Sequence, residues 1–254
     1  MKARWMCLLT LLVTKLCIAE SSDSSEKIIY GIPHWPPHTI IEKNTYSGRD
    51  VELLNMLAEK IGFKIEYSPC EWVRCLELAK TGKVDLLTDV SHSAEREAFL
   101  DYVQPAYSVG SILFWVKKGQ ASLINDIDEL IFLTIGKEKG AKLFKTIDEN
   151  PNIEFYESTD FTILIKMLVS GRIDTIMGSD LATRHLIQNS DYASRLELAN
   201  FQHKVPSSYL ALSRHSANAS KWLPEFEKHM QTMMLSGELE YFLNWKDSDN
   251  TSKH

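Results

Sequence analysis

One stretch of this chain occurs twice in altered form. Residues 78–85 read LAKTGKVD, and residues 167–174 read MLVSGRID. Both copies place apolar residues before a glycine, then a basic residue, a β-branched residue and an aspartate after it. A glycine that follows apolar residues at helical spacing is typical of a helix end, and a strand can start soon after it. The repeat therefore predicts two related helix–glycine–strand units.

The agreement between the two copies extends beyond the glycine. With the glycines aligned, Trp72 falls on Phe161 and Ser91 falls on Asp180. A glycine between a helix and a strand is common in α/β proteins, which explains the glycine and the apolar residues. It does not explain why the aromatic residue lies at the same distance from the glycine in both copies. Two related halves predict two similar lobes, and a cleft between lobes is a preferred place for a small molecule.

The first copy leads into residues 84–96, which begin as an apolar run and turn polar within a few residues. The run suits a buried strand, Ser91 can cap a following helix, and Arg96 lies in the first turn of that helix. A strand that carries a polar loop and an arginine at its carboxyl end is how an open α/β sheet presents a ligand site. Alternatively, Arg96 is a solvated partner of Glu95 or Glu97, and Ser91 is only an N-cap.

Composition is that of an ordinary globular protein. The 254 residues allow one large domain or two modest ones, and 44% hydrophobic residues supply a core. The formal net charge is −6, and no basic block stands out. Nucleic acid is therefore not an expected partner.

The first residues have the features of a secretory signal peptide. Lys2 and Arg4 give a positive start, residues 5–13 are mostly apolar, and small residues lead up to Ala19. The apolar run is too short to span a bilayer. We expect residues 1–19 to be a signal peptide that is cleaved after Ala19 on export. Residues 20–26 are expected to be a flexible lead-in.

Export would leave Cys70 and Cys75 in an oxidising compartment. Within one helix these cysteines would be too far apart to bond, but Pro69 places Cys70 in the loop before the helix and brings the pair within disulfide reach. We predict a Cys70–Cys75 disulfide, with two buried thiols as the alternative. A metal site is not expected, because no histidine or second cysteine pair lies close by.

Hydrophobic periodicity predicts alternating strands and helices in both halves. An apolar and aromatic face in the tail, formed by Trp222, Phe226, Met230 and Met233, is expected to be core rather than binding surface. The expected strands cover residues 27–32, 63–67, 84–89, 107–116, 131–135, 153–156, 173–177 and 209–213. The expected helices cover residues 48–62, 71–80, 141–147, 161–169 and 181–188, followed by two in the tail.

Several motifs occur together in an order that resembles one known family. This chain is similar to the periplasmic solute-binding proteins of ABC importers, in the polar amino-acid-binding group called bacterial extracellular solute-binding protein family 3. The resemblance covers nearly all of the mature chain. It is carried by the helix at residues 48–62, GKVD at 82–85, S-x-S-x-E-R at 91–96, DYVQPAY at 101–107, GRID at 171–174 and the tail at 237–245.

The resemblance implies an α/β protein with the two-lobed periplasmic binding protein fold (type II). Each lobe is a β-sheet flanked by helices, and the ligand cleft lies between the lobes, which close by a hinge. We expect residues 27–116 to form the first part of lobe one, residues 117–209 lobe two, residues 210–245 the return to lobe one, and residues 246–254 a disordered tail.

The resemblance also implies site residues. The carboxylate-binding arginine of the family matches Arg96, and the family's cap residue matches Ser91. A guanidinium offers a planar, bidentate fork to a carboxylate. Trp35 and Trp72 match two cleft aromatics, although either could belong to the core. Asp89 matches a position that usually offers a backbone or small polar group, so it puts a carboxylate in the cleft unless it is a solvated loop acid.

Lobe two departs from the family pattern. The position of the family's acid for the ligand's α-amino group is Ser179 here, with Asp180 one place on. The family's serine or threonine after the glycine of lobe two becomes Ala141, after Gly140. Asp180 either binds the amino group after a small shift or only caps the helix that follows it.

The expected function is periplasmic binding of a small polar solute, an amino acid or a related carboxylate. The protein is expected to be a monomer without a cofactor, and to deliver its ligand to an ABC permease in the inner membrane. One alternative is an enzyme similar to cyclohexadienyl dehydratase, which has the same fold, with Asp89, Asp180 or Glu138 as general acid or base. Another is a ligand-sensing protein that reports to a membrane receptor.

Overall fold

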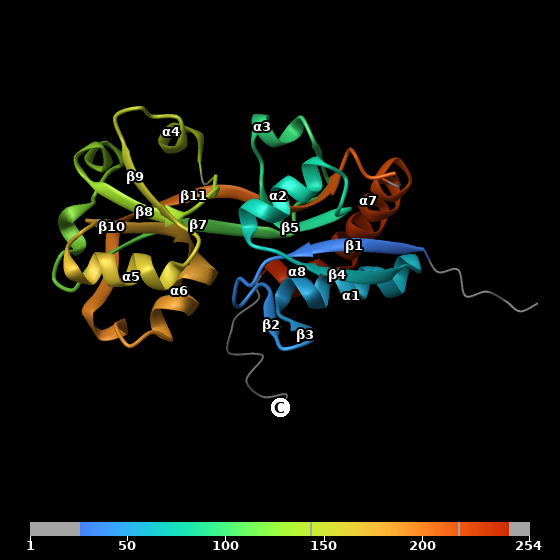
Figure 1. The fold of residues 1–254 in the computed structure, drawn as a ribbon, viewed down its shortest axis with the longest axis horizontal. Helices are drawn as coiled ribbons and strands as arrows, with labels where there is room; N and C mark the ends of the chain where they lie inside the picture. The colour runs from blue at the N-terminus through green and yellow to red at the C-terminus, as the bar shows by residue number, and fades with distance from the viewer. Residues whose placement is uncertain (1–25, 143, 218, 244–254) are drawn as a thin grey trace, which may run out of the picture.

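The computed structural model describes residues 26–142, 144–217 and 219–243. The chain forms two lobes, with lobe one on the right of Figure 1 and lobe two on the left. The expected signal peptide, most of the expected lead-in and the expected tail at 246–254 lie outside the described residues. Within them, no helix has the length and apolar character needed to cross a membrane.

Lobe one is built from the first part of the chain and from its last helices. Its elements are β1 (Lys27–Ile32), β2 (Ile40–Glu42), β3 (Thr45–Ser47), α1 (Arg49–Ile61), β4 (Lys64–Pro69), α2 (Trp72–Lys80), β5 (Leu86–Ser91), α3 (Ala94–Glu97), β6 (Leu100–Tyr102), α7 (Ala219–Ser236) and α8 (Glu238–Leu243).

Lobe two contains the central part of the chain, and two long strands connect the lobes. Its elements are η1 (Ala121–Leu123), η2 (Ile127–Phe132), β8 (Thr134–Glu138), α4 (Lys145–Asp148), β9 (Glu154–Ser158), α5 (Phe161–Ser170), β10 (Thr175–Ser179), α6 (Asp180–Gln188) and η3 (Ala193–Arg195). The connecting strands are β7 (Ser108–Lys117) and β11 (Leu196–Ser213).

The two lobes repeat the same strand arrangement. Lobe one has the order β4-β1-β5 and lobe two the order β9-β8-β10, all parallel within each set. Antiparallel β11 and β7 join the sets into one hydrogen-bonded sheet, and Ser208 pairs with Ser91 of β5 and with Ser108 of β7. This two-fold arrangement agrees with the repeat in the sequence.

The repeated glycines end the helices as expected. Gly171 adopts the left-handed conformation that closes α5, with φ of 73°. Gly82 follows α2 with φ of 68°, and a Cβ there would lie 2.3 Å from the carbonyl oxygen of His215. Only glycine fits such a close approach, so both helices turn sharply into the strands that lead to the cleft.

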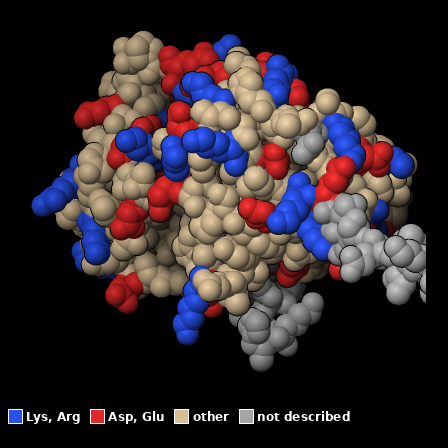
Figure 2. Space-filling model, turned by 45° about the vertical axis from the view of Figure 1, so that its right-hand side comes forward, with Lys and Arg blue, Asp and Glu red and all other residues tan. Residues whose placement is uncertain are grey.

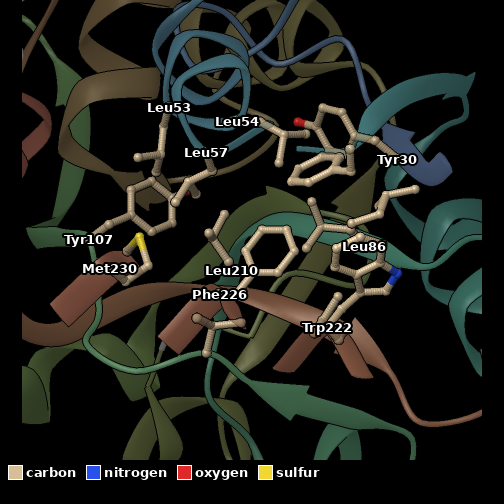
Figure 3. Packing of buried hydrophobic residues seen from close by; sticks show 14 of the residues in the cluster. Tyr30, Leu53, Leu54, Leu57, Leu86, Tyr107, Leu210, Trp222, Phe226 and Met230 are labelled. Carbon is tan, nitrogen blue, oxygen red and sulfur yellow. The ribbon is translucent and has the colours of Figure 1, made fainter. Parts of the chain in front are cut away.

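A hydrophobic core fills the space between α1, α7 and the sheet of lobe one (Figure 3). Tyr30, Leu54, Leu86 and Phe226 are among its fully buried side chains. The tail face that was expected to be core is buried in this cluster, at Trp222, Phe226, Met230 and Met233.

Strand β7 is an inner strand of lobe two. Ile112, Phe114 and Val116 enter one hydrophobic cluster of that lobe, and Leu113 and Trp115 enter another on the opposite face. The alternation is that of a strand buried on both faces. Residues 112–116 therefore pack within lobe two, and β11 pairs with β5 of lobe one from Ser208 to Leu212.

Lobe two also differs in detail from the expected elements. The residues around 131 were expected to form a strand, but η2 occupies them because Asp126 and Glu129 form a capping box, and β8 starts only at Thr134. The helix expected at 141–147 is reduced to α4, whose start is held by a hydrogen bond from the Phe144 N–H to Asp148. The β2–β3 hairpin was not expected.

Charged side chains of both signs intermingle over the face shown in Figure 2. Ion pairs on the surface include Lys27–Glu66 and Lys60–Glu238. Exposed pairs of this kind contribute little to stability, so the fold rests mainly on its hydrophobic clusters.

Candidate functional site: the cleft between the lobes

A cavity of about 700 Å³ lies between the lobes and is lined by residues of both. Its size is that of a site for a small molecule. The cavity brings together all the site residues expected from the sequence: Trp35, Trp72, Asp89, Ser91, Arg96, Ser179 and Asp180.

The strands deliver these residues at their carboxyl ends. Pro33 follows β1, Asp89 and Ser91 end β5, Glu138 ends β8, and Ser179 ends β10. Open α/β sheets bind ligands at this edge, because the loops there are free to carry polar groups. The repeated topology turns the carboxyl ends of both strand sets toward the same cavity.

Arg96 is almost completely buried at the boundary of the lobes. Its Nη1 donates a hydrogen bond to the carbonyl oxygen of Ser91 at 2.9 Å, and its Nη2 donates to the carbonyl oxygen of Gly140, in lobe two, at 3.0 Å. Burial lowers the pKa of Arg96, while Tyr102 and Glu95 act against that shift. In the part of the chain that the structure describes, no ion pair to a carboxylate is formed by Arg96.

Aromatic side chains line the cavity on both sides. The guanidinium of Arg96 lies 5.3 Å from the ring centroid of Trp72, within range of a cation–π interaction. Trp35 meets Phe161 of lobe two edge to face, with ring centroids 5.9 Å apart. Trp72 and Phe161, which the repeat aligns, are the first residues of α2 and α5, so the repeat places an aromatic residue at the cleft from each lobe.

The loop that carries Trp35 is tightly held. Backbone hydrogen bonds join Trp35 and Thr39 in both directions, and the Thr39 hydroxyl donates to the carbonyl oxygen of Pro33 at 2.6 Å. Prolines flank Trp35 on both sides, at Pro33 and Pro36. A side chain on so constrained a loop loses little freedom when a ligand packs against it.

The disulfide expected from the sequence is present between Cys70 and Cys75. It joins the end of β4 to the first turn of α2, and the Cα atoms are 5.4 Å apart. Cys75 is fully buried. The bond therefore fixes the start of the helix that brings Trp72 to the cavity.

A buried polar cluster lies on the lobe-one side of the cavity. Arg49 donates from Nε to Asp50 at 2.9 Å, and its Nη2 lies 3.4 Å from Oδ1 of Asp89. Burial alone would raise the pKa of Asp50, but Arg49 and His38 outweigh burial and lower that pKa to about 2. Asp50 is therefore ionised at neutral pH, and Arg49 is shared between two carboxylates.

His38 belongs to the same cluster but lies farther from its carboxylates. Its side chain is 4% exposed, and Nδ1 lies 3.8 Å from Asp50 and 3.7 Å from Asp89, beyond hydrogen-bond distance. Both ring nitrogens of His38 and Oδ2 of Asp50 lack a hydrogen-bond partner among the described residues. Unpaired buried polar atoms beside a cavity indicate a place for an additional polar group.

Asp89 occupies an unusual backbone conformation at the end of β5. Its φ is 52°, in the left-handed region that aspartate tolerates better than most residues. Its N–H donates to the Tyr107 hydroxyl at 2.7 Å. The turn holds the Asp89 carboxylate toward Arg49 and the cavity, so Asp89 is not simply a solvated loop acid.

Glu138 is the carboxylate of lobe two that faces this cluster. It ends β8 and lines the cavity, and no donor to its carboxylate is found within the described residues. Burial, Asp89 and Glu71 raise the pKa of Glu138 to about 8, although Arg96 acts in the opposite direction. Glu138 is therefore mostly protonated at neutral pH, and Asp89, from the opposite lobe, disfavours its ionisation.

Ser179 and Asp180 stand at the other side of the cavity, where β10 meets α6. Asp180 accepts a hydrogen bond from Nε of Arg184 at 2.8 Å, and both side chains are about 40% exposed. Ser179 occupies the N-cap position, but its side chain makes no capping hydrogen bond. The Asp180 carboxylate can reach a ligand only by sharing or releasing Arg184.

The sequence did not identify His38, Arg49 or Asp50 as site residues. Arg49 and Asp50 begin α1 directly after Gly48, a position at which polar residues are common at helix starts. Their charges and the polar loop that follows β1 are the sequence features that could have pointed to a site here. Only the fold shows that this helix start lies beside Asp89.

The described ranges were searched for residues that could hold a metal ion. No group of histidine, cysteine, aspartate and glutamate side chains there is arranged to hold a metal ion. The arrangement suits ligand capture: a buried guanidinium, aromatic faces and carboxylates around one enclosed volume.

Comparison with known proteins gives the same picture. The sequence model of the bacterial extracellular solute-binding proteins, family 3, matches residues 28–244. The chain is 24% identical over 231 residues to the "Arginine-binding extracellular protein ArtP" of Bacillus subtilis (strain 168), across 87% of this chain and 86% of ArtP. Further curated relatives match over 55–63% of their own length.

Two solved structures have the same fold. "An ancestral arginine-binding protein bound to arginine" has a TM-score of 0.70 at 19% identity, over 85% of this chain and 96% of that chain. A histidine kinase sensor domain with similarity to periplasmic binding proteins has a TM-score of 0.72 at 16% identity, over 86% of this chain and 94% of that chain. The expected two-lobed type II fold is thereby confirmed.

The family match also bears on the choice between binding and catalysis. It extends across both lobes and the tail helices, and both the family and ArtP are named for binding. Solute binding is therefore supported by the family and by the curated relatives, and a dehydratase activity is supported less. The chain belongs to the bacterial extracellular solute-binding proteins, family 3.

Proposed function

We propose that this protein is exported, captures a small polar solute with a carboxylate group, and delivers it to an ABC permease in the inner membrane. The solute is an amino acid or a related carboxylate. In this proposal the signal peptide ends at Ala19 and the binding protein works as a monomer. The observation that carries the proposal is Arg96, a buried cation in the cleft with no carboxylate partner among the described residues.

The hydrogen bonds of Arg96 leave room for a ligand. A guanidinium carries five N–H donors, and its bonds to the carbonyl oxygens of Ser91 and Gly140 use two of them. The remaining donors offer a carboxylate charge-assisted hydrogen bonds in a site from which water is largely excluded. A carboxylate would also supply the negative charge that this buried cation lacks.

Closure around the ligand explains how both lobes take part. Arg96 belongs to lobe one but donates to Gly140 of lobe two, and Trp35 packs against Phe161 across the cleft. A ligand bound at Arg96 would add contacts that exist only when the lobes are together. Binding proteins of this shape move as two bodies about a hinge, here at β7 and β11.

The relatives support the ligand class. ArtP is named for arginine, and one of the solved structures holds arginine. These compounds carry the carboxylate that the Arg96 site would recognise. The lobe-two position that resembles the family's amine-binding acid is Ser179 in this chain, so the identity of the amino acid does not follow from the relatives.

The decisive test is a screen followed by one substitution. A thermal-shift screen of amino acids and organic acids identifies carboxylates that stabilise the protein, and titration calorimetry measures their affinity. We expect Arg96→Lys to weaken binding of such a hit by tens- to thousands-fold, because a point ammonium cannot replace a bidentate fork; truncating a desolvated ion pair costs about 2–5 kcal/mol.

The control is Arg214→Lys, which changes an arginine that pairs with Asp101 on the surface, at 48% side-chain exposure. This variant should bind like the wild type. Equal affinities for wild type and Arg96→Lys would contradict the proposal, as would a screen in which no carboxylate raises the melting temperature.

A further inference from the structure

We propose that Lys137 is a positioning residue for closure of the cleft: its buried ammonium holds residues 138–142 of lobe two, the segment that meets Arg96 of lobe one. Lys137 is not among the residues that line the cavity, so it acts through the backbone that it holds. The inference rests on the proposed function, because closure matters only if the cleft captures a solute. It adds a residue to that function without restricting the solute.

Lys137 is an uncommon residue for its position, because it lies in a buried strand. It belongs to β8, two residues after the fully buried Ile135, and its own side chain is only 5% exposed. Lysine is among the residues that are least often buried, and an ammonium away from water must be paired and hydrogen-bonded. The contacts of this ammonium therefore show what the charge does.

The ammonium of Lys137 contacts groups from several elements. Its Nζ donates hydrogen bonds to Oδ1 of Asp148 in α4, at 3.1 Å, and to the carbonyl oxygen of Ala141, at 3.3 Å. Oε1 of Glu157 in β9 lies 3.6 Å away, and the ring centroid of Phe155 lies 4.1 Å away. One cation thus ties β8, β9 and α4 to the segment between β8 and α4.

The segment that Lys137 holds is a tight turn at the edge of lobe two. The Ala141 N–H donates to the carbonyl oxygen of Glu138 at 3.1 Å. Gly140 has a φ of 79°, in the region that favours glycine. The bond from Lys137 to the Ala141 carbonyl adds a fixed point to this turn from inside lobe two.

The same turn makes contacts with lobe one. The carbonyl oxygen of Gly140 accepts a hydrogen bond from Arg96 at 3.0 Å, and a Cβ at Gly140 would lie 3.0 Å from Cγ2 of Val73. Lys142 lies 3.7 Å from Glu95. These contacts form only while the turn keeps its shape and position, because hydrogen bonds tolerate little change in distance and angle. A group that fixes the turn therefore also determines how well the lobes close.

A buried ion pair suits such a positioning role. Removal of two charges from water costs free energy, so a buried pair often stabilises a fold no better than well-packed apolar residues of similar volume. What the pair adds is direction, because its hydrogen bonds have a narrow range of geometry. Lys137 and Asp148 are only 5% and 6% exposed, so water competes little for these bonds. The pair therefore contributes the position of the turn more than the stability of the lobe.

Cross-linking across the cleft measures closure without any solute. Glu95→Cys and Lys142→Cys place thiols where the two side chains meet, and a short bismaleimide joins them, while Cys70 and Cys75 stay in their disulfide. In this background Lys137→Met keeps the apolar stem and removes the ammonium. It should slow cross-linking by about five-fold or more, because a hydrogen bond contributes about 1 kcal/mol and 1.4 kcal/mol corresponds to ten-fold.

Two further variants separate position from stability. Lys137→Met combined with Asp148→Asn leaves no unpaired carboxylate in the core, so it should melt at a higher temperature than Lys137→Met and still cross-link as slowly. Thr175→Val is the matched control, because Thr175 is a fully buried residue of lobe two that donates to the carbonyl oxygen of Trp115 at 3.0 Å and does not line the cavity. It should lower the melting temperature but cross-link at the rate of the parent.

Cross-linking of Lys137→Met at the rate of the parent would overturn the inference. So would equal slowing in Thr175→Val, because loss of stability alone would then explain the effect, and so would recovery of the rate in the double variant, which would assign the effect to the unpaired Asp148. If Lys137→Met does not fold, the double variant is compared with Thr175→Val in its place. The proposed function is tested separately, by the affinity of Arg96→Lys.

Discussion

Buried charges of opposite sign meet different conditions in this cleft. Arg96 is surrounded by carbonyl oxygens and an aromatic face, and these stabilise its charge although burial lowers its pKa. For Glu138, burial, Asp89 and Glu71 outweigh the support of Arg96, and its pKa rises to about 8. The charge of Arg96 is thus stabilised before any ligand binds, whereas the charge of Glu138 is not. Groups with such perturbed pKa values are typical of functional sites.

Asp180 provides a prediction at this scale. Because its carboxylate already pairs with Arg184 and is about 40% exposed, we expect Asp180→Ala to change ligand affinity by less than about three-fold. Ser179→Ala should have an equally small effect. Titration calorimetry with a hit from the screen provides the measurement. A loss of ten-fold or more for Asp180→Ala alone would instead mean that the amine-binding acid of the family has moved by one position.

The sequence could identify those site residues that lie close together in one motif of the chain. Arg96, Ser91 and the residues near them follow a strand at constant spacing, and the structure brings them to the cavity. His38 and Asp50 could not be identified in this way, because their role depends on burial beside Asp89. Burial of a polar side chain is produced by tertiary contacts and leaves little trace in local sequence.

At the scale of elements, the disulfide is expected to stabilise the start of α2. Replacing both Cys70 and Cys75 by alanine removes the short loop that they close, and the loop-entropy relation gives a loss of about 2 kcal/mol for a loop of about this size. Urea denaturation should show a lower midpoint for the double variant. Reduced wild-type protein should show a similar decrease.

Alkylation before reduction provides the independent check on the disulfide. If mass spectrometry finds two labelled thiols in the folded, non-reduced wild type, the bond does not form and the stability prediction loses its basis. Unlabelled cysteines with an unchanged urea midpoint in the double variant would show that the bond forms but contributes nothing measurable.

The elements themselves were predictable to different degrees in the two lobes. Strong periodicity and glycine ends define α1, α2 and α5, so these helices lie close to their expected positions. The segment from η2 to α4 was not predictable from hydrophobicity alone. There, a capping box at Asp126 and the buried Lys137–Asp148 ion pair, at 3.1 Å, decide the conformation over short distances.

For the whole molecule, opposing contacts determine how readily the lobes close. The Arg96–Gly140 hydrogen bond, the Lys142–Glu95 ion pair and the Trp35–Phe161 contact hold them together. Repulsion of Glu138 by Asp89 acts against closure and is relieved if Glu138 is protonated. The equilibrium between open and closed forms should therefore depend on pH when no ligand is present.

The direction of this dependence follows from the raised pKa of Glu138. In the closed form burial, Asp89 and Glu71 raise this pKa to about 8 against the pull of Arg96, whereas in an open, hydrated cleft it should return toward its ordinary value near 4.5. The closed form thus binds the proton more tightly, and closure loses free energy as pH rises between these two values.

Small-angle X-ray scattering of the unliganded protein tests this dependence. The radius of gyration should be larger at pH 9 than at pH 6, as the population shifts toward the open form. Glu138→Gln cannot ionise at this position, so its radius should stay close to the low-pH value of the wild type across that range. The same increase in radius for wild type and Glu138→Gln would show that another group controls closure, whereas an increase confined to the wild type would identify ionisation of Glu138 as the cause.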